Sequence, residues 1–325
     1  MVGWLARRII QAIIVLLAMS IIVFIGVYAI GNPVDILIAP DAGEAERQAV
    51  IRAFGLDKPL WQQYLLFLSN IVRGDFSNSF VFGEPALQLI LRRMPATLEL
   101  ATLSVLISLV VGIPLGVYAG LRPNTGISKT IMTGSILGFS LPTFWVGLML
   151  MMLFAVQLRW LPASGRGDTV QVLGVGWSIL TIDGLRHLAL PAITLSLSSI
   201  AVVLRLSMSG VREVITADFI KFARAKGLSN GRIVRVHVLK SIMVPIITVV
   251  GLDFGTTVAF AIVIENIFAW PGMGKLIIDS IASLDRPVIV AYLMIVVVMF
   301  VVINLLVDLA YTLIDPRIQR EGRSS

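Results

Sequence analysis

Long apolar stretches separated by polar segments dominate the hydrophobic pattern of this chain of 325 residues. The first stretch, 9–30, contains no charged residue. A helix needs about 20 apolar residues to cross the hydrocarbon core of a bilayer, and this stretch has that length. Five more stretches are of similar length, so the pattern predicts an all-α membrane protein with six transmembrane helices, at 9–30, 96–121, 130–156, 187–209, 242–264 and 288–314.

The first stretch can also be read as a signal peptide. Its apolar run exceeds a typical signal-peptide core and no Ala-x-Ala-like site precedes Gly31, so an uncleaved helix is favoured. Six spans bring both termini to one side, and Lys and Arg near span ends are retained in the cytoplasm. We predict cytoplasmic termini, because this places inside the cluster between 212 and 240 and the basic residues Arg7, Arg8, Arg122, Lys129, Arg317, Arg320 and Arg323.

Two segments are predicted on the outer side. Segment 31–95 is mixed in charge, with six basic and seven acidic residues, and its apolar spacing predicts short helices near 44–54 and 59–72. They form a small external cap whose apolar residues pack on the membrane domain: Leu60, Tyr64, Phe67, Leu68 and Ile71. Loop 157–186 is rich in Gly, Ser and Thr; it predicts a short strand pair near 170–176 and indicates no chemistry.

Composition supports the membrane interpretation and excludes several classes. The chain is 57% hydrophobic and 14% charged, with a mean hydropathy of +0.94, which a water-soluble domain could not hide. Its net charge of +7 is explained by cytoplasmic Lys and Arg, so no nucleic-acid partner is expected. Cysteine is absent, and His187 and His237 lie too far apart to indicate a metal site. We expect no catalytic residue, bound metal or cofactor in this chain.

The basic loop 212–240 is far longer than a connection requires, and its pattern is helix, break, helix. Ile215, Phe219 and Phe222 lie at i, i+4 and i+7, so they share one helical face, with the basic residues away from it. Gly227 can adopt a left-handed cap, and Ser229 can cap the next helix. The pattern alone leaves two readings open, a helix resting on anionic lipid and a helix that offers an apolar ridge to a partner.

The residues from Asp218 to Leu228, followed by His237, resemble the coupling motif of ABC importer permeases. Lys221-Phe222-Ala223 stands where the wider importer pattern has Glu-Ala-Ala, and the form found in the dipeptide, oligopeptide and nickel branch fits better. In that family this helix docks into a cleft on the ATPase subunit. The resemblance thus implies a coupling role for Ile215, Asp218, Phe219, Phe222, Ala223, Arg224, Ala225, Lys226 and Gly227.

Four further segments resemble the same branch, so the similarity covers nearly the whole chain. They are Arg93-Met-Pro-Ala-Thr-Leu-Glu-Leu100, Ser140-Leu-Pro-Thr-Phe-Trp-Val-Gly147, Leu161-Pro-Ala-Ser-Gly165 and the segment Glu265–Gly274. The resemblance implies the type I importer permease fold, with a transmembrane helix and cap over 1–94, a shared core over 95–314 and a cytoplasmic tail over 315–325.

The same resemblance implies a prokaryotic inner-membrane complex. Its other parts are a second homologous permease, two ATP-binding subunits that use ATP and Mg, and a periplasmic or lipid-anchored solute-binding protein, with membrane lipid around them. Peptides are the first expectation for the substrate; nickel chelates, glutathione and other small solutes stay open. This chain would be the first, B-type, permease.

Charged residues within spans are costly and need a reason. Glu99, Arg205 and Asp308 lie near predicted span ends, where reaching the headgroups is the simpler explanation. Asp253 lies deeper, on a helix that carries small and polar neighbours: Gly251, Gly255, Thr256 and Thr257. This face either lines the translocation path or packs on the partner permease, and the pattern does not separate the two.

A break follows the fifth span at Pro271, Gly272 and Gly274, and Trp270 suits an interfacial level. By resemblance this segment, with Glu265, is the external gate. It differs from a P-loop, since it lacks the first glycine and the Ser or Thr after the lysine, so it is not an ATP site.

Two other functions fit the sequence less well than transport by an ABC importer. An ion-coupled secondary transporter would need more polar residues at mid-membrane. An intramembrane enzyme would need a catalytic constellation, for which neither histidine is placed.

Overall fold

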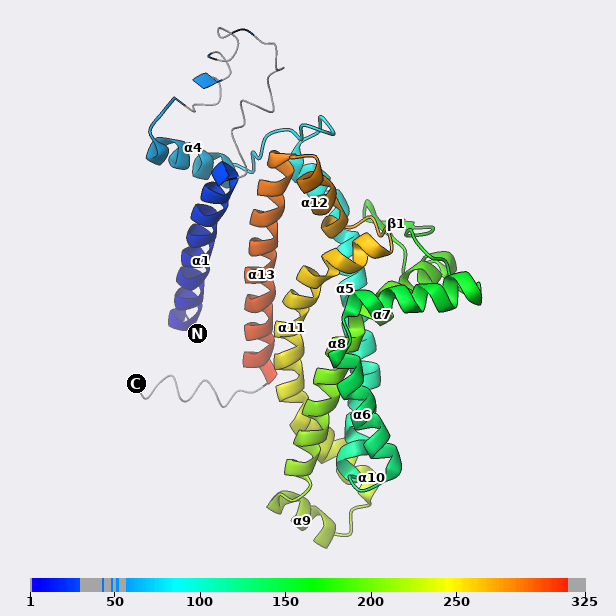
Figure 1. Ribbon diagram of the computed structural model, residues 1–325. Coiled ribbons are helices and arrows are strands. Elements are labelled where there is room, and N and C mark those ends of the chain that lie inside the picture. The colour runs from blue at the N-terminus through cyan, green and yellow to red at the C-terminus, as the bar shows by residue number, and fades with distance from the viewer. Residues whose placement is uncertain (1, 30–42, 44–47, 49–50, 53–56, 315–325) are drawn as a thin grey trace. The chain divides into compact units, whose positions relative to one another are not determined.

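The computed structural model describes the chain except for residues 1, 30–42, 44–47, 49–50, 53–56 and 315–325 (Figure 1). The described part is mostly helical. Its elements are α1 (Val2–Ala29), α4 (Leu60–Val72), α5 (Ala86–Leu121), α6 (Gly126–Ser140), α7 (Thr143–Leu150), the π-helical turn η1 (Met151–Gln157), β1 (Val170–Val172), β2 (Val175–Trp177), α8 (Ile182–Val214), α9 (Asp218–Ala225), α10 (Asn230–Arg232), the π-helical turn η2 (Ile233–Val238), α11 (Leu239–Ile267), α12 (Met273–Ala282) and α13 (Arg286–Ile314).

Five helices of the described chain are long and apolar enough to cross a membrane, and a bent pair brings the number up to six. The bent pair is the predicted third span, which is therefore not one straight helix. α6 and the α7–η1 helix meet at an angle of 105°. The cause is Pro142, since a residue before proline favours an extended backbone and Leu141 has ψ 136°.

The chain divides into two compact units, Met1–Arg92 with Ile277–Val301 and Arg93–Leu276 with Val302–Ser325. In the first unit α4 confirms the predicted helix at 59–72. Phe67 and Ile71 pack against Val23, Val290 and Met294, as the apolar spacing predicted. Leu60 instead stays exposed. The other predicted cap helix, 44–54, falls largely outside the described residues.

A short hairpin precedes α5 in this first unit. It is closed by a bridge between Asn78 and Pro85. The buried carboxylate of Asp285, at the start of α13, accepts the hydroxyl of Ser79 and, at 3.1 Å, the backbone N–H of Phe80. Two segments that are far apart in sequence are thereby joined by a buried carboxylate.

The core of the second unit follows α8 along its length. One apolar cluster joins the first half of α8, through residues such as Leu188 and Leu195, to α5, α11 and Trp270. A second cluster joins the other half, through Val203 and Val211, to α9, η2 and α11. The helices α8 and α11 thus contribute residues to both clusters and connect them.

Three glycines of α5, spaced four residues apart, let its backbone approach α8. A Cβ added at Gly112 would lie 2.9 Å from Val203, and one at Gly120 would lie 2.7 Å from Val211. A Cβ at Gly116 would overlap the carbonyl oxygen of Leu204. Small residues at this spacing permit close helix approach, as in helix pairs within membranes.

Candidate functional site

The helix α9 is anchored to the core by its inner face. Ile220 and Ala223, three residues apart, are buried in the second apolar cluster of the unit, together with Ile233 and Val238. Lys221 pairs with Asp218 at 2.8 Å, but both side chains are exposed, so this pair adds little. The predicted short helix is confirmed, and apolar burial fixes its position.

The outer face of α9 carries two large apolar side chains that the described chain covers only in part. Phe219 is 49% exposed and Phe222 is 62% exposed. The ammonium group of Lys226 lies 4.5 Å from the centre of the Phe222 ring, so this cation does not lie away from the ridge as predicted. Ile215 does not belong to the ridge, because it follows α8 and packs partly buried on the core.

The end of α9 has the geometry predicted from Gly227. This residue has φ +77°, the left-handed conformation that glycine adopts at low cost. Its N–H donates to the carbonyl of Arg224 at 2.9 Å, and that of Leu228 donates to the carbonyl of Ala223 at 3.2 Å, which is the Schellman pattern. Ser229 is the N-cap of α10, but its side chain makes no capping hydrogen bond.

Asp253 has its partners within this chain. The hydroxyl of Ser199 on α8 donates to its carboxylate at 2.5 Å, and that of Thr256 donates at 2.9 Å. Of the predicted face, Gly255 is buried, whereas Thr256 is exposed. Gly251 lies directly against Val307 of α13. Part of this face therefore packs within the chain, and the exposed part is centred on Thr256.

The predicted gate segment is built around the buried carboxylate of Glu265. It accepts the hydroxyl of Thr97 at 2.6 Å and the backbone N–H of Lys275, in the first turn of α12, at 3.0 Å. Thr97 in turn accepts the N–H of Met273 at 2.8 Å. A Cβ on Gly272 would overlap the carboxylate, so this glycine is required by close approach.

Trp270 is fully buried within the chain, and its interfacial level stays a prediction. Its indole N–H donates to the carbonyl of Ala96 at 2.9 Å, and its backbone N–H donates to that of Glu265 at 2.8 Å. A buried indole needs such a partner for its N–H. The predicted helix break at Pro271 is confirmed, since α11 ends at Ile267 and α12 begins at Met273.

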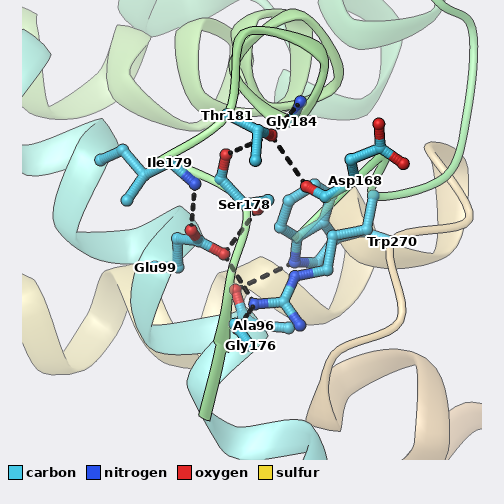
Figure 2. A network of polar contacts seen from close by, with 10 residues as sticks. Ala96, Glu99, Asp168, Gly176, Ser178, Ile179, Thr181, Gly184 and Trp270 are labelled. Carbon is cyan, nitrogen blue, oxygen red and sulfur yellow. Dashed lines mark hydrogen bonds and ion pairs between the residues drawn. The ribbon is translucent and has the colours of Figure 1, made fainter. Parts of the chain in front are cut away.

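Glu99 is the centre of a network that the sequence did not indicate (Figure 2). The carboxylate is buried, not directed to headgroups as expected. It pairs with Arg166 at 2.8 Å and accepts the hydroxyl of Ser178 at 2.7 Å and the N–H of Ile179 at 2.5 Å. Arg166 also donates to the carbonyl of Gly176 at 2.7 Å.

This network attaches the loop 157–186 to α5. The strand pair predicted there is confirmed, with Val170 opposite Trp177. The guanidinium of Arg166 also lies 5.7 Å from the centre of the Trp270 ring, so the loop, α5 and the gate segment meet at one place (Figure 2). No role was predicted for this loop, and its hydrogen bonds and ion pair with Glu99 were therefore not foreseen.

The other charged span residues have simpler surroundings. The guanidinium of Arg205 lies 4.8 Å from the centre of the Phe139 ring on α6, and Asp308 is partly buried. No group of three metal-ligating side chains occurs among the described residues. The class of protein that emerges is a polytopic membrane protein with a short helix, α9, whose aromatic side chains are exposed, and with buried carboxylates that are hydrogen-bonded within the chain.

Comparisons with known proteins identify the family. Residues 112–320 match the model described as "Binding-protein-dependent transport system inner membrane component", and residues 1–101 match the model for the N-terminal part of such a component. The oligopeptide transport system permease protein AppB of Bacillus subtilis (strain 168) is 37% identical over 321 residues, which is 98% of this chain and 100% of the relative.

A second relative is the dipeptide transport system permease protein DppB of Escherichia coli (strain K12), 36% identical over 338 residues, covering 99% of this chain and 100% of the relative. Among solved structures, a chain of the MetNI methionine ABC transporter in an inward facing conformation aligns with a TM-score of 0.57 at 17% identity. It covers 70% of this chain and 97% of that chain, and it supports the fold alone.

The chain belongs to the family of binding-protein-dependent transport system inner membrane components. It is a multi-pass permease subunit of an ABC importer, with the type I importer permease fold, and a transport protein rather than an enzyme. The resemblance seen in its motifs is confirmed. The comparisons give no support to an ion-coupled secondary transporter.

Proposed function

We propose that this chain forms half of the translocation pathway of an importer for peptides or similar small solutes in the cytoplasmic membrane of a prokaryote. The other half is a second homologous permease. Two ATP-binding subunits bind ATP and Mg, and a periplasmic or lipid-anchored solute-binding protein delivers the solute. Full-length similarity to permeases named for oligopeptide and dipeptide transport supports this proposal.

The coupling part of the proposal rests on α9, which has one face buried in its own unit and one face exposed. Buried Ile220 and Ala223 hold the helix on its own unit, and the exposed Phe219 and Phe222 are left for another protein. Clustered aromatic side chains are typical binding hot spots. A force applied to this ridge reaches the core through the buried face. The ATPase subunit is its partner in this proposal.

Alanine substitution of the ridge tests the coupling role. We expect Phe222→Ala to cost about 2 kcal/mol of ATPase binding, a loss of roughly 30-fold in affinity. Phe219→Ala should add to the loss, and both variants should insert and fold normally. Phe82→Ala, at another exposed phenylalanine, is the matched control and should leave affinity unchanged. Co-purification and titration of the ATPase subunits measure the effect.

The lipid reading of α9 makes the opposite prediction. If its basic residues rested on anionic headgroups, Lys221→Ala with Arg224→Ala would disturb transport and Phe222→Ala would not. Normal ATPase affinity and normal transport in Phe222→Ala would therefore overturn the coupling proposal. Transport measured in vesicles with and without anionic lipid separates the two readings.

For the pathway, the proposal assigns Asp253, Gly255 and Thr256 to its wall or to contact with the second permease. The exposed hydroxyl of Thr256, hydrogen-bonded to Asp253, supports this assignment. The external gate comprises Glu265, Trp270, Pro271, Gly272 and Gly274. Normal transport and assembly in both Asp253→Asn and Gly255→Leu would exclude the pathway assignment.

Substrate choice is tested on the assembled transporter. We expect ATP-dependent uptake of labelled di- and tripeptides into vesicles that contain both permeases, the ATPase subunits and the solute-binding protein. Thermal shift of the solute-binding protein with peptides, nickel chelates and glutathione identifies the class. Uptake driven by an ion gradient without ATPase subunits would refute the importer mechanism.

The proposal also keeps both termini in the cytoplasm and the divisions 1–94, 95–314 and 315–325, the last lying outside the described residues. The distribution of Lys and Arg supports this orientation. Reporter fusions at the two termini test it. A reporter that is active only outside the cytoplasm should stay silent at either end.

A further inference from the structure

The helix α4 has two apolar sectors, and only one of them packs on its own unit. Tyr64 shares a hydrogen bond of 2.8 Å with Ser20 of α1, and its ring meets that of Phe24 edge-on at 5.4 Å. Phe67 and Ile71 extend this contact toward the apolar cluster formed by α1 and α13. One side of α4 is therefore fully accounted for by contacts within the unit.

The second sector is formed by Trp61, Leu65 and Val72. At about 100° per residue these three lie within roughly 40° of one another around the helix. They are 63%, 54% and 80% exposed, so the described chain leaves the whole stripe open. Asn70 is also exposed and lies nearly opposite the stripe, and Leu66, which is 44% exposed, lies about 40° from Asn70 around the helix.

The position of α4 along α1 sets the depth of this stripe. α1 is apolar from Ile9 to its last residue, Ala29, and α4 packs on Ser20, Val23 and Phe24. At about 1.5 Å per residue, these contacts lie roughly 8–14 Å inside the C-terminal end of α1. Figure 1 shows α4 lying across the C-terminal end of α1. The apolar face of a helix that lies in the membrane interface is buried about 5–10 Å, so it reaches toward this depth.

We propose that α4 is an interfacial helix whose stripe of Trp61, Leu65 and Val72 is covered by lipid of the leaflet at the C-terminal end of α1. The stripe continues the surface that α1 already offers to lipid, because Ile21, Ile22 and Ile25 of α1 are exposed at the same level. Tryptophan is enriched at this depth, where its ring is partly apolar and partly hydrated. The inference concerns a surface outside the coupling helix and the pathway, and it does not depend on the proposed function.

Site-directed spin labelling tests the proposal directly, because the chain has no cysteine and single-cysteine variants need no other change. Labels at Trp61→Cys, Leu65→Cys and Val72→Cys are compared in the complete transporter in lipid nanodiscs. We expect each to be accessible to oxygen and shielded from a water-soluble nickel chelate, like a label at Ile22→Cys. The control Asn70→Cys should show the reverse.

Three results would overturn the proposal. Labels accessible to the nickel chelate would place the stripe in water. Labels shielded from both reagents would mean that protein covers it, either the second permease or the segment 30–56. Labels that lose accessibility only when the solute-binding protein is added would identify that protein as the occupant.

A second measurement avoids cysteine altogether. The fluorescence of the native protein minus that of Trp61→Phe isolates the emission of Trp61 among the six tryptophans. We expect this component to lose at least half of its intensity in vesicles of lipid brominated near the headgroup, and to be little affected by acrylamide. Strong acrylamide quenching with no effect of brominated lipid would refute the lipid contact.

Discussion

The two ends of the second unit are held together by different interactions. At one end, α9 is held by apolar burial of Ile220 and Ala223 and leaves Phe219 and Phe222 uncovered. At the other, the carboxylates of Glu99 and Glu265 are buried, and hydroxyl, guanidinium and backbone donors of the same chain surround them.

This difference predicts how each end responds to substitution. A buried carboxylate is tolerated only when its partners are in place, so the Glu99 and Glu265 end tolerates little substitution. An exposed aromatic ridge on an apolar anchor needs no partner to fold. We therefore expect substitutions at the first end to act on stability, and those at the ridge to act on assembly.

The largest expected effect is at Glu99. Replacement by alanine leaves the guanidinium of Arg166, whose side chain is 16% exposed, without its carboxylate. We expect Glu99→Ala to lower the free energy of unfolding by about 3–5 kcal/mol. The control is Glu84→Ala, which breaks the exposed pair with Arg92 and should cost at most about 1 kcal/mol. Equal unfolding midpoints for Glu99→Ala and Glu84→Ala in detergent would contradict the expected difference between the buried and the exposed ion pair.

A smaller loss of stability is expected at Gly272. The added methyl group of Gly272→Ala would meet the Glu265 carboxylate, so α12 must move, at a cost of about 1–3 kcal/mol. Gly138→Ala in α6 is the matched control, because a Cβ there meets nothing within 4 Å. That variant should gain about 0.5–1 kcal/mol from helix propensity. The same unfolding measurement tests both, and stabilisation of both would show that the gate segment is not close-packed.

The smallest effect is expected at Gly227, where space is open and only backbone strain acts. The left-handed backbone of this residue should make Gly227→Ala about 1 kcal/mol less stable. The loss should be confined to the cap of α9, where hydrogen exchange would rise. Gly231→Ala, with ordinary φ and no close neighbour, is the control and should not raise exchange.

Features set by local chemistry could be predicted from the sequence. The apolar stretches are long enough to predict the spans, and Gly227 marks the end of α9 because few other residues adopt its backbone conformation. The bend at Pro142 was missed although its signal, a proline in mid-span, was present. The glycine spacing of Gly112, Gly116 and Gly120 was likewise visible in the sequence as a close-approach motif.

Features set by distant partners could not be predicted. Glu99 and Arg166 are 67 positions apart, and nothing in their local sequence indicates that they pair. The position of Glu99 near a span end therefore predicted contact with headgroups, whereas its carboxylate is buried in the protein. The partner of Trp270 could not be predicted for the same reason, because the carbonyl of Ala96 that accepts its indole N–H lies 174 positions away. The stripe of Trp61, Leu65 and Val72 on α4 was not predicted, because the apolar spacing singled out other residues of that helix.

The glycine contacts between α5 and α8 have a mechanical consequence. Backbone that lies against backbone leaves no room for one helix to slide along the other, because a shift of one residue would bring a side chain where only glycine fits. The two helices should therefore behave as one stiff strut that begins beside α9. Work done on α9 would tilt the strut as a whole. A pair of spin labels, one on each helix, should then keep a constant separation throughout the transport cycle.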